Sequence, residues 1–138
     1  MTKNKVELAC IIDDDDMYVN LIKKIIEAKQ LCKNLLVFEN GKDALYHFEA
    51  LLKNLNRDNI PEIIFLDINM PIMDGWEFLN KFTQIKNKFG KVITLYIVSS
   101  SINPVDIEKA KNINSVKDYI IKPITIEELE AVFLKESA

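Results

Sequence analysis

Five polar residues each stand directly after an apolar run of this sequence, and their side chains offer carboxylates, a hydroxyl and an ammonium. They are Asp13, Asp14, Asp67, Ser99 and Lys122. Three carboxylates brought together repel one another, and either a raised pKa or a bound cation relieves that repulsion. Mg²⁺ suits such a site because it prefers oxygen ligands and is commonly held by one or two carboxylates plus a phosphate. We therefore expect a divalent cation, Mg²⁺ or Mn²⁺, at these acids.

The lysine and the serine extend this expectation from metal binding to phosphate chemistry. A phosphoryl group needs neutralising charge and hydrogen-bond donors at its outer oxygens, and Lys122 and Ser99 are residues of those types. A carboxylate beside Mg²⁺ can attack phosphorus and form an acyl phosphate. Asp67 is the best candidate nucleophile because it follows an apolar run that is expected to form the central strand.

Other polar residues near these positions have simpler interpretations. Asp15 and Asp16 are expected to cap a helix, and capping is also the alternative role for the acids just before them. Asp74 precedes Gly75, which is a common turn pair. His47, the single histidine, falls within an expected helix and is predicted to be a surface or boundary residue rather than a metal ligand.

The sequence alternates between short apolar runs and segments with helical periodicity. The sequence predicts five strands, at Val6–Ile12, Leu35–Phe38, Ile63–Leu66 and Ile93–Val98 and within Val116–Ile121, of which the first and third are expected to be buried. This alternation predicts a parallel sheet with helices on both faces, which is a doubly wound α/β fold. Ligands bind such sheets beyond the carboxyl ends of the strands, so the five polar residues should meet at one edge.

Helical spacing of apolar residues predicts which side of each helix faces the sheet. The first helix is expected to bury Met17, Leu21, Ile22, Ile25 and Ile26. The second is expected to bury Ala44, Leu45, Phe48, Leu51, Leu52 and Leu55. A third helix is predicted from Gly75 to Lys86, a less regular fourth after Asn103-Pro104, and a last one with Ile126, Leu129, Val132 and Phe133 inward.

Length and composition narrow the class of protein. A chain of 138 residues is one domain's worth, so residues 1–138 are expected to form a single domain without an output domain. With a net charge of −3, the chain lacks the excess of basic residues that is typical of nucleic-acid binding. Cys10 and Cys32 cannot build a disulfide framework, and no signal peptide or membrane span is evident, so a reduced, cytoplasmic protein is expected.

Four motifs in order resemble the receiver domain of two-component response regulators, over nearly the whole chain. They are Ile12-Asp13-Asp14, Leu66-Asp67-Ile68-Asn69-Met70-Pro71 with Asp74-Gly75, Val98-Ser99-Ser100, and Tyr119-Ile120-Ile121-Lys122-Pro123. Each motif alone is weak, but all four fall at predicted strand ends. The resemblance implies a five-stranded parallel sheet of order 2-1-3-4-5 in a flavodoxin-like three-layer sandwich, an order for which a member of this family is a standard example.

The resemblance implies a role for each residue at the expected site. Asp67 is similar to the phosphoryl acceptor of the family, and Asp13 and Asp14 to the acidic pair that holds Mg²⁺. Asn69 is expected to lend its backbone carbonyl to the metal. Lys122 is expected to pair with the phosphorylated Asp67.

The resemblance also implies a switch. Ser99 is expected to move towards the phosphoryl group, and Tyr119 to turn inward and carry the change to the surface of the fourth and fifth helices. For Tyr119 the alternative is a plain core-boundary aromatic. The Lys122-Pro123 bond is expected to be cis. Asn112–Asp118 departs from the family in lacking a glycine-containing turn before the last strand.

The function implied is that of a response regulator in a phosphorelay. A histidine kinase or histidine phosphotransfer protein donates to Asp67, and the altered surface then binds a downstream protein or a second copy of the chain. Such a protein is not a classical enzyme, although it catalyses its own phosphorylation and slow dephosphorylation. The alternatives are a Mg²⁺-dependent phosphohydrolase, disfavoured because Asn69 stands where a second acid would be needed, and a scaffold that needs no phosphorylation.

Overall fold

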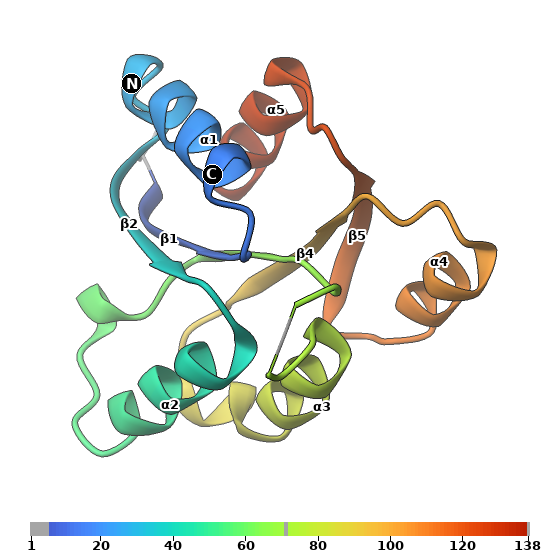
Figure 1. The fold of residues 1–138 in the computed structure, drawn as a ribbon. Coiled ribbons are helices and arrows are strands. Elements are labelled where there is room, and N and C mark those ends of the chain that lie inside the picture. The colour runs from blue at the N-terminus through green and yellow to red at the C-terminus, as the bar shows by residue number, and fades with distance from the viewer. Residues whose placement is uncertain (1–5, 71, 138) are drawn as a thin grey trace.

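The computed structural model describes residues 6–70 and 72–137. Pro71, the last residue of the motif that begins at Leu66, lies outside the described residues. Strands and helices alternate along the chain, as the apolar periodicity predicted (Figure 1). In order they are β1 (Val6–Ile12), α1 (Asp16–Ala28), β2 (Cys32–Phe38), α2 (Gly41–Leu51), η1 (Arg57–Asn59), β3 (Ile63–Leu66), α3 (Gly75–Ile85), η2 (Lys86–Phe89), β4 (Thr94–Ser99), α4 (Pro104–Lys111), β5 (Val116–Ile121) and α5 (Ile126–Glu136).

All five strands are parallel and lie in the order β2-β1-β3-β4-β5. This confirms the doubly wound fold and the strand order that the sequence analysis gave. Leu66, the last residue of β3, pairs with Ile12, the last residue of β1, and on the other side with Ile97, two residues before the end of β4. The residues that follow these strands are therefore delivered to one edge, with β3 at the centre of the sheet.

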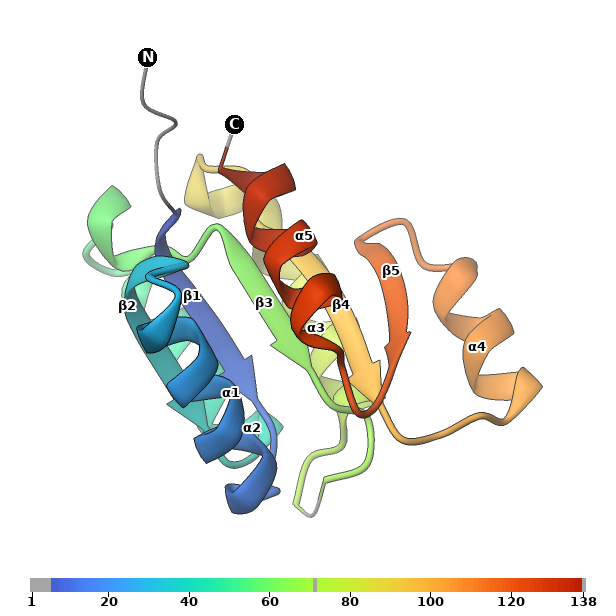
Figure 2. The same ribbon diagram turned by 90° about the horizontal axis from the view of Figure 1, so that it is seen from above.

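Helices cover both faces of the sheet (Figures 1 and 2). The face under α1 and α5 receives one set of strand side chains, including Ala9 and Ile11 of β1. The other face, under α2 and α3, receives the alternate set, including Cys10 and Ile12. Because successive strand residues point to opposite faces, near-continuous apolar runs are what a sheet buried on both sides requires.

Four phenylalanines pack together on the face of the sheet that α2 and α3 cover. Phe48 of α2 lies 5.2 Å from Phe82 of α3 and 6.1 Å from Phe89 of η2, measured between ring centroids. Phe78 stacks on Phe82 at 5.4 Å. All four rings are buried, and each contributes roughly 1.5–3 kcal/mol through removal of apolar surface from water.

The buried side of α1 differs from the prediction. The helix buries Val19, Ile22 and Ile26, whereas Met17 is 85% exposed and Leu21 is 55% exposed. At 100° per residue the three buried residues span an arc of about 60°, and Met17 and Leu21 lie on the opposite side. The prediction is confirmed for Ile22 and Ile26 and wrong for Met17 and Leu21, because Val19 belongs to the buried stripe in their place.

Two other residues predicted to face inward are exposed for a different reason. Leu55 lies beyond the end of α2 and is 49% exposed. Ile126 is the first residue of α5 and is 42% exposed, while Leu129, Val132 and Phe133 are buried as predicted. In both cases the periodicity was extended beyond the part of the helix that packs on the sheet.

A hydrogen-bonded network closes the amino-terminal edge of the sheet. Glu62, just before β3, accepts hydrogen bonds from the backbone N–H groups of Glu7 and Leu8 in β1. Lys91 lies 3.2 Å from the Glu62 carboxylate and donates to the carbonyl of Ile60 at 2.7 Å. Glu62 and Lys91 therefore satisfy each other's charge at this edge.

Candidate functional site

Three carboxylates meet at the carboxyl-terminal edge of the sheet. Asp13 and Asp14 follow β1, and Asp67 follows β3, its neighbour in the sheet. One oxygen from each lies within 4.8 Å of those of the other two. Asp13 and Asp67 are buried, with 3% and 5% of their surfaces exposed, while Asp14 is exposed. The arrangement offers hard oxygen donors around a point that solvent can reach from the Asp14 side.

Backbone groups and a lysine orient the two buried carboxylates. The N–H of Asp15 donates to Oδ1 of Asp13 at 3.0 Å, and the N–H of Asn69 donates to Oδ1 of Asp67 at 3.3 Å. The Lys122 ammonium lies 2.8 Å from Oδ2 of Asp13 and 3.7 Å from Oδ2 of Asp67. One lysine thus sits against two acids, so negative charge is in excess at this edge.

The pKa values of the two buried acids reflect their burial first and that excess of negative charge second. Burial raises the pKa of Asp67 to about 6, and the charge of Asp13 adds to the increase. Lys122 and two backbone N–H groups act in the opposite direction. Burial also raises the pKa of Asp13, against the hydrogen bond from Lys122. A bound divalent cation would favour the ionised form of both groups.

Backbone and side-chain contacts position Lys122. Its backbone N–H donates to the carbonyl of Ser99 at 2.9 Å, which joins the end of β5 to the end of β4. The Lys122-Pro123 bond is cis, as predicted. The ammonium also lies 4.4 Å from the centroid of the Tyr18 ring in α1. Tyr18 was not foreseen, and its place one turn into the helix after the acids was its only signal.

Gly75 makes a contact that the sequence analysis treated only as turn chemistry. A Cβ atom at this position would lie 2.3 Å from the carbonyl oxygen of Asp67 and 2.6 Å from Cα of Ile68. The Gly75 N–H donates to the carbonyl of Ile68 at 3.1 Å. Asp74, which was predicted only as a turn residue, caps α3 by accepting from the N–H of Glu77. Only glycine lets α3 begin this close to the backbone of the candidate nucleophile.

The loop after β4 links Ser99 to two other elements through Ser101. The Ser99 side chain is fully buried, and its Oγ accepts from the N–H of Ser101 at 3.1 Å. The Ser101 hydroxyl donates to Asp106 of α4 at 2.6 Å, and the Tyr119 hydroxyl donates to the Ser101 carbonyl at 2.8 Å. Tyr119 is therefore joined to the Ser99 loop and makes no hydrogen bond to the carboxylates among the described residues.

His47 occupies the boundary position predicted for it. Its half-buried ring lies 5.1 Å from that of Phe38 and 5.6 Å from that of Phe48. Its Nε2 has no hydrogen-bond partner within residues 6–70 and 72–137, and burial lowers its pKa.

The fold and this edge of carboxylates define a class of signalling protein. The chain matches the model of the response regulator receiver domain over residues 9–133. It belongs to this family, whose members are signalling domains of two-component systems rather than classical enzymes. The resemblance stated from the four motifs is thereby confirmed. That residues 1–138 form one receiver domain without an output domain stays a prediction.

Individual relatives place the chain within that family. A two component response regulator from Cytophaga hutchinsonii has a solved structure that is 31% identical, with a TM-score of 0.80 over 96% of this chain and 97% of that chain. The sensor histidine kinase CheAY of Helicobacter pylori is 35% identical over 88% of this chain, which spans 14% of the kinase. The probable methanogenesis regulatory protein FilR2 of Methanothrix harundinacea is 24% identical over 87% of this chain and 74% of that protein.

No helix within the described part of the chain is long and apolar enough to cross a membrane.

Proposed function

We propose that the chain accepts a phosphoryl group on Asp67 from a phosphohistidine donor, with Mg²⁺ or Mn²⁺ bound beside it. The observation that carries the proposal is the convergence of three carboxylates around a single lysine at the end of the central strand. Asp67 is the acceptor because it follows that strand. Lys122, which lies 2.8 Å from Asp13 and 3.7 Å from Asp67, is near enough to pair with a phosphoryl oxygen added to Asp67.

The donor set fits a hard divalent cation. Asp13, Asp14 and Asp67 present carboxylate oxygens within 4.8 Å of one another, and the backbone carbonyl of Asn69 is proposed as a further ligand. When bound, the cation neutralises the acids and the oxygens of the incoming phosphoryl group. The raised pKa of Asp67 agrees with this assignment, because a cation beside the carboxylate offsets both causes of the increase, which are burial and then the charge of Asp13.

The transfer itself is a displacement at phosphorus. A carboxylate oxygen of Asp67 forms a bond to phosphorus while the bond from phosphorus to the donor imidazole nitrogen breaks. The electron pair of that bond stays on the imidazole, which then takes up a proton. The product is an acyl phosphate on Asp67, and Lys122 pairs with the added negative charge.

The hydrogen bonds around Ser101 suggest how the phosphorylated state is transmitted. If the Ser99 hydroxyl turns to donate to a phosphoryl oxygen, the bond it accepts from Ser101 is disturbed. Ser101 in turn holds α4 through Asp106 and β5 through Tyr119. A downstream protein that binds this surface would detect the change. Transfer from a histidine kinase or a histidine phosphotransfer protein agrees with the occurrence of similar chains within kinases such as CheAY.

Incubation with Mg²⁺ and acetyl phosphate tests the acceptor. The protein should gain one phosphoryl group per chain, measured by intact mass, and lose it in hydroxylamine, which cleaves acyl phosphates. The matched controls are Asp67→Asn, which should not label, and Asp58→Asn, which changes an exposed aspartate of η1 and should label normally. Labelling of Asp67→Asn to the wild-type extent would refute the assignment of the acceptor. Sustained release of phosphate far beyond one equivalent per chain would favour a phosphohydrolase instead.

A further inference from the structure

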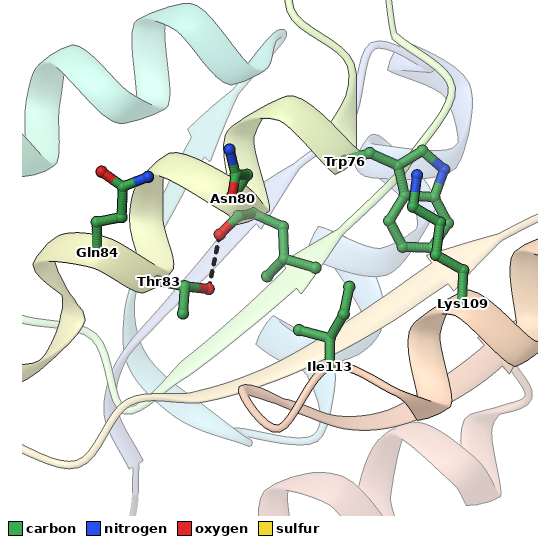
Figure 3. A pocket seen from close by; sticks show the side chains of 7 residues that line it. Trp76, Asn80, Thr83, Gln84, Lys109 and Ile113 are labelled. Carbon is green, nitrogen blue, oxygen red and sulfur yellow. Dashed lines mark hydrogen bonds between the residues drawn. The ribbon is translucent and has the colours of Figure 1, made fainter.

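A groove between α3 and α4 is lined by residues that take no part in the carboxylate site (Figure 3). Its volume is about 560 Å³, which lies within the range of small-molecule sites in proteins. The apolar surface of the groove comes from Trp76 and Leu79 of α3 and from Ile113, which follows α4. Leu79 is buried, and Trp76 and Ile113 are half-buried against the core.

One end of the groove carries a cation that lacks an anionic partner. The Lys109 ammonium lies 4.5 Å from the centroid of the Trp76 ring, and Figure 3 shows the two side chains together. Among the described residues, no carboxylate lies within ion-pair distance of Lys109. Asn80 and Gln84 of α3 also line the groove, and their exposed amides make no hydrogen bond to another described side chain or backbone group.

A hydroxyl contact joins the two walls of the groove. The Thr83 hydroxyl donates to the carbonyl of Leu79 at 2.7 Å and lies 2.9 Å from the hydroxyl of Ser115. This second contact links α3 to the segment between α4 and β5. A ligand would therefore meet a preformed site, and would lose less free energy to ordering than on a flexible surface.

We propose that this groove binds a small organic anion with a flat apolar body. The body would pack on the indole of Trp76 and on Ile113, and the anionic group would pair with the Lys109 ammonium at the Trp76 end of the groove. A cationic ligand is disfavoured because Lys109 would repel it. A wholly apolar ligand is disfavoured because it would cover Lys109 without offering it a partner, which costs free energy.

The sequence offers a direct reporter of binding, since Trp76 is the single tryptophan. The probe is anilinonaphthalene sulfonate, which joins an aromatic body to an anionic group and accepts energy from tryptophan. Titration into the unphosphorylated protein should quench Trp76 fluorescence to saturation. Phenylnaphthylamine, which lacks the sulfonate, should bind about fivefold to tenfold more weakly, as expected for the loss of one charge-assisted hydrogen bond at a partly exposed site.

Two variants on α4 separate a specific ion pair from general charge. Lys109→Gln should weaken binding of the sulfonate by about fivefold to tenfold and should not weaken binding of phenylnaphthylamine. Lys111→Gln, on the same helix but outside this groove, should bind like wild type. Both lysines are exposed, so the variants should fold normally, and circular dichroism verifies it.

Several results would overturn the proposal. They are quenching that does not saturate, equal affinity for the two probes, and equal weakening by the two lysine variants. Quenching that appears only together with an increase in particle size would assign the groove to contacts between copies of the chain. The titration needs neither Mg²⁺ nor a phosphoryl donor, so its outcome is independent of the proposed phosphorylation.

Discussion

Replacing Asp67 with asparagine should stabilise the protein in the absence of a divalent cation. Burial and the charge of Asp13 raise the pKa of Asp67 from 3.8 to about 6, so its ionised form is disfavoured in the folded chain. At about 1.36 kcal/mol per pKa unit, this shift corresponds to about 3 kcal/mol at neutral pH. The amide must still satisfy the local hydrogen bonds, so we expect a gain of about 2 kcal/mol in the free energy of unfolding. Lys122 would keep its partner, because it lies 2.8 Å from Asp13.

The dependence on pH fixes the sign of this effect. A carboxyl whose pKa is higher in the folded than in the unfolded chain binds more protons when folded, so stability falls as pH rises between the two values. For Asp67 this window runs from pH 3.8 to about 6. The wild type should lose stability across it through Asp67, and the asparagine variant should not. The gain should be close to zero at about pH 4 and complete by about pH 7.

Urea unfolding followed by circular dichroism, with a chelator present, measures the effect. Asp58→Asn serves as the control, because this exposed carboxylate forms no ion pair among the described residues and its loss should change stability by less than about 0.5 kcal/mol. Adding Mg²⁺ should stabilise the wild type more than Asp67→Asn. A variant that is no more stable than wild type at pH 7, or equally stabilised at pH 4, would refute the reasoning.

Three further substitutions test other parts of the structure, each by urea unfolding. Gly75→Ala should cost more than about 2 kcal/mol because its Cβ meets backbone atoms, whereas Gly90→Ala, with φ of 66° and open space around it, should cost only about 1 kcal/mol. Lys122→Met should cost about 3 kcal/mol at neutral pH because it leaves Asp13 buried without a cation, and Mg²⁺ should restore part of the loss. Ile72→Gly should gain about 0.5 kcal/mol, because Ile72 is exposed with φ of 70°.

Each of these expectations has an outcome that contradicts it. Equal losses at the two glycines would mean that α3 does not begin against the backbone after β3. A Lys122→Met protein as stable as wild type without Mg²⁺ would mean that Asp13 is already neutral. A loss at Ile72→Gly would show that the side chain contributes more than its backbone conformation costs.

The strand ends were predictable because each apolar run stops where a polar residue begins. Asp13, Asp67, Ser99 and Lys122 all follow such stops, and a parallel sheet brings strand ends together whatever their separation in sequence. The motif around them was specific enough to indicate the family. What the sequence could not supply was the distance between side chains, such as the 2.8 Å between Lys122 and Asp13.

Other features depend on tertiary contacts that leave no local pattern. Gly75 is read equally well as an ordinary turn glycine until the backbone of Asp67 is seen beside it. Ser101 looks like one serine of three, yet it links β4, α4 and β5. Met17 and Leu21 were wrongly predicted to face inward, because their spacing is helical but they lie on the side of α1 that faces away from the sheet.

The two edges of the sheet differ in how well their charges are balanced, since Glu62 and Lys91 pair at one edge and acids are in excess at the other. The amino-terminal edge is closed by satisfied hydrogen bonds, while the carboxyl-terminal edge crowds three acids around one cation. Transient opening should therefore begin at the acidic edge, and amide hydrogens there should exchange with solvent sooner than those near Leu8. The chain would thus concentrate its mobility where an incoming donor must gain access, while the far edge keeps the sheet assembled.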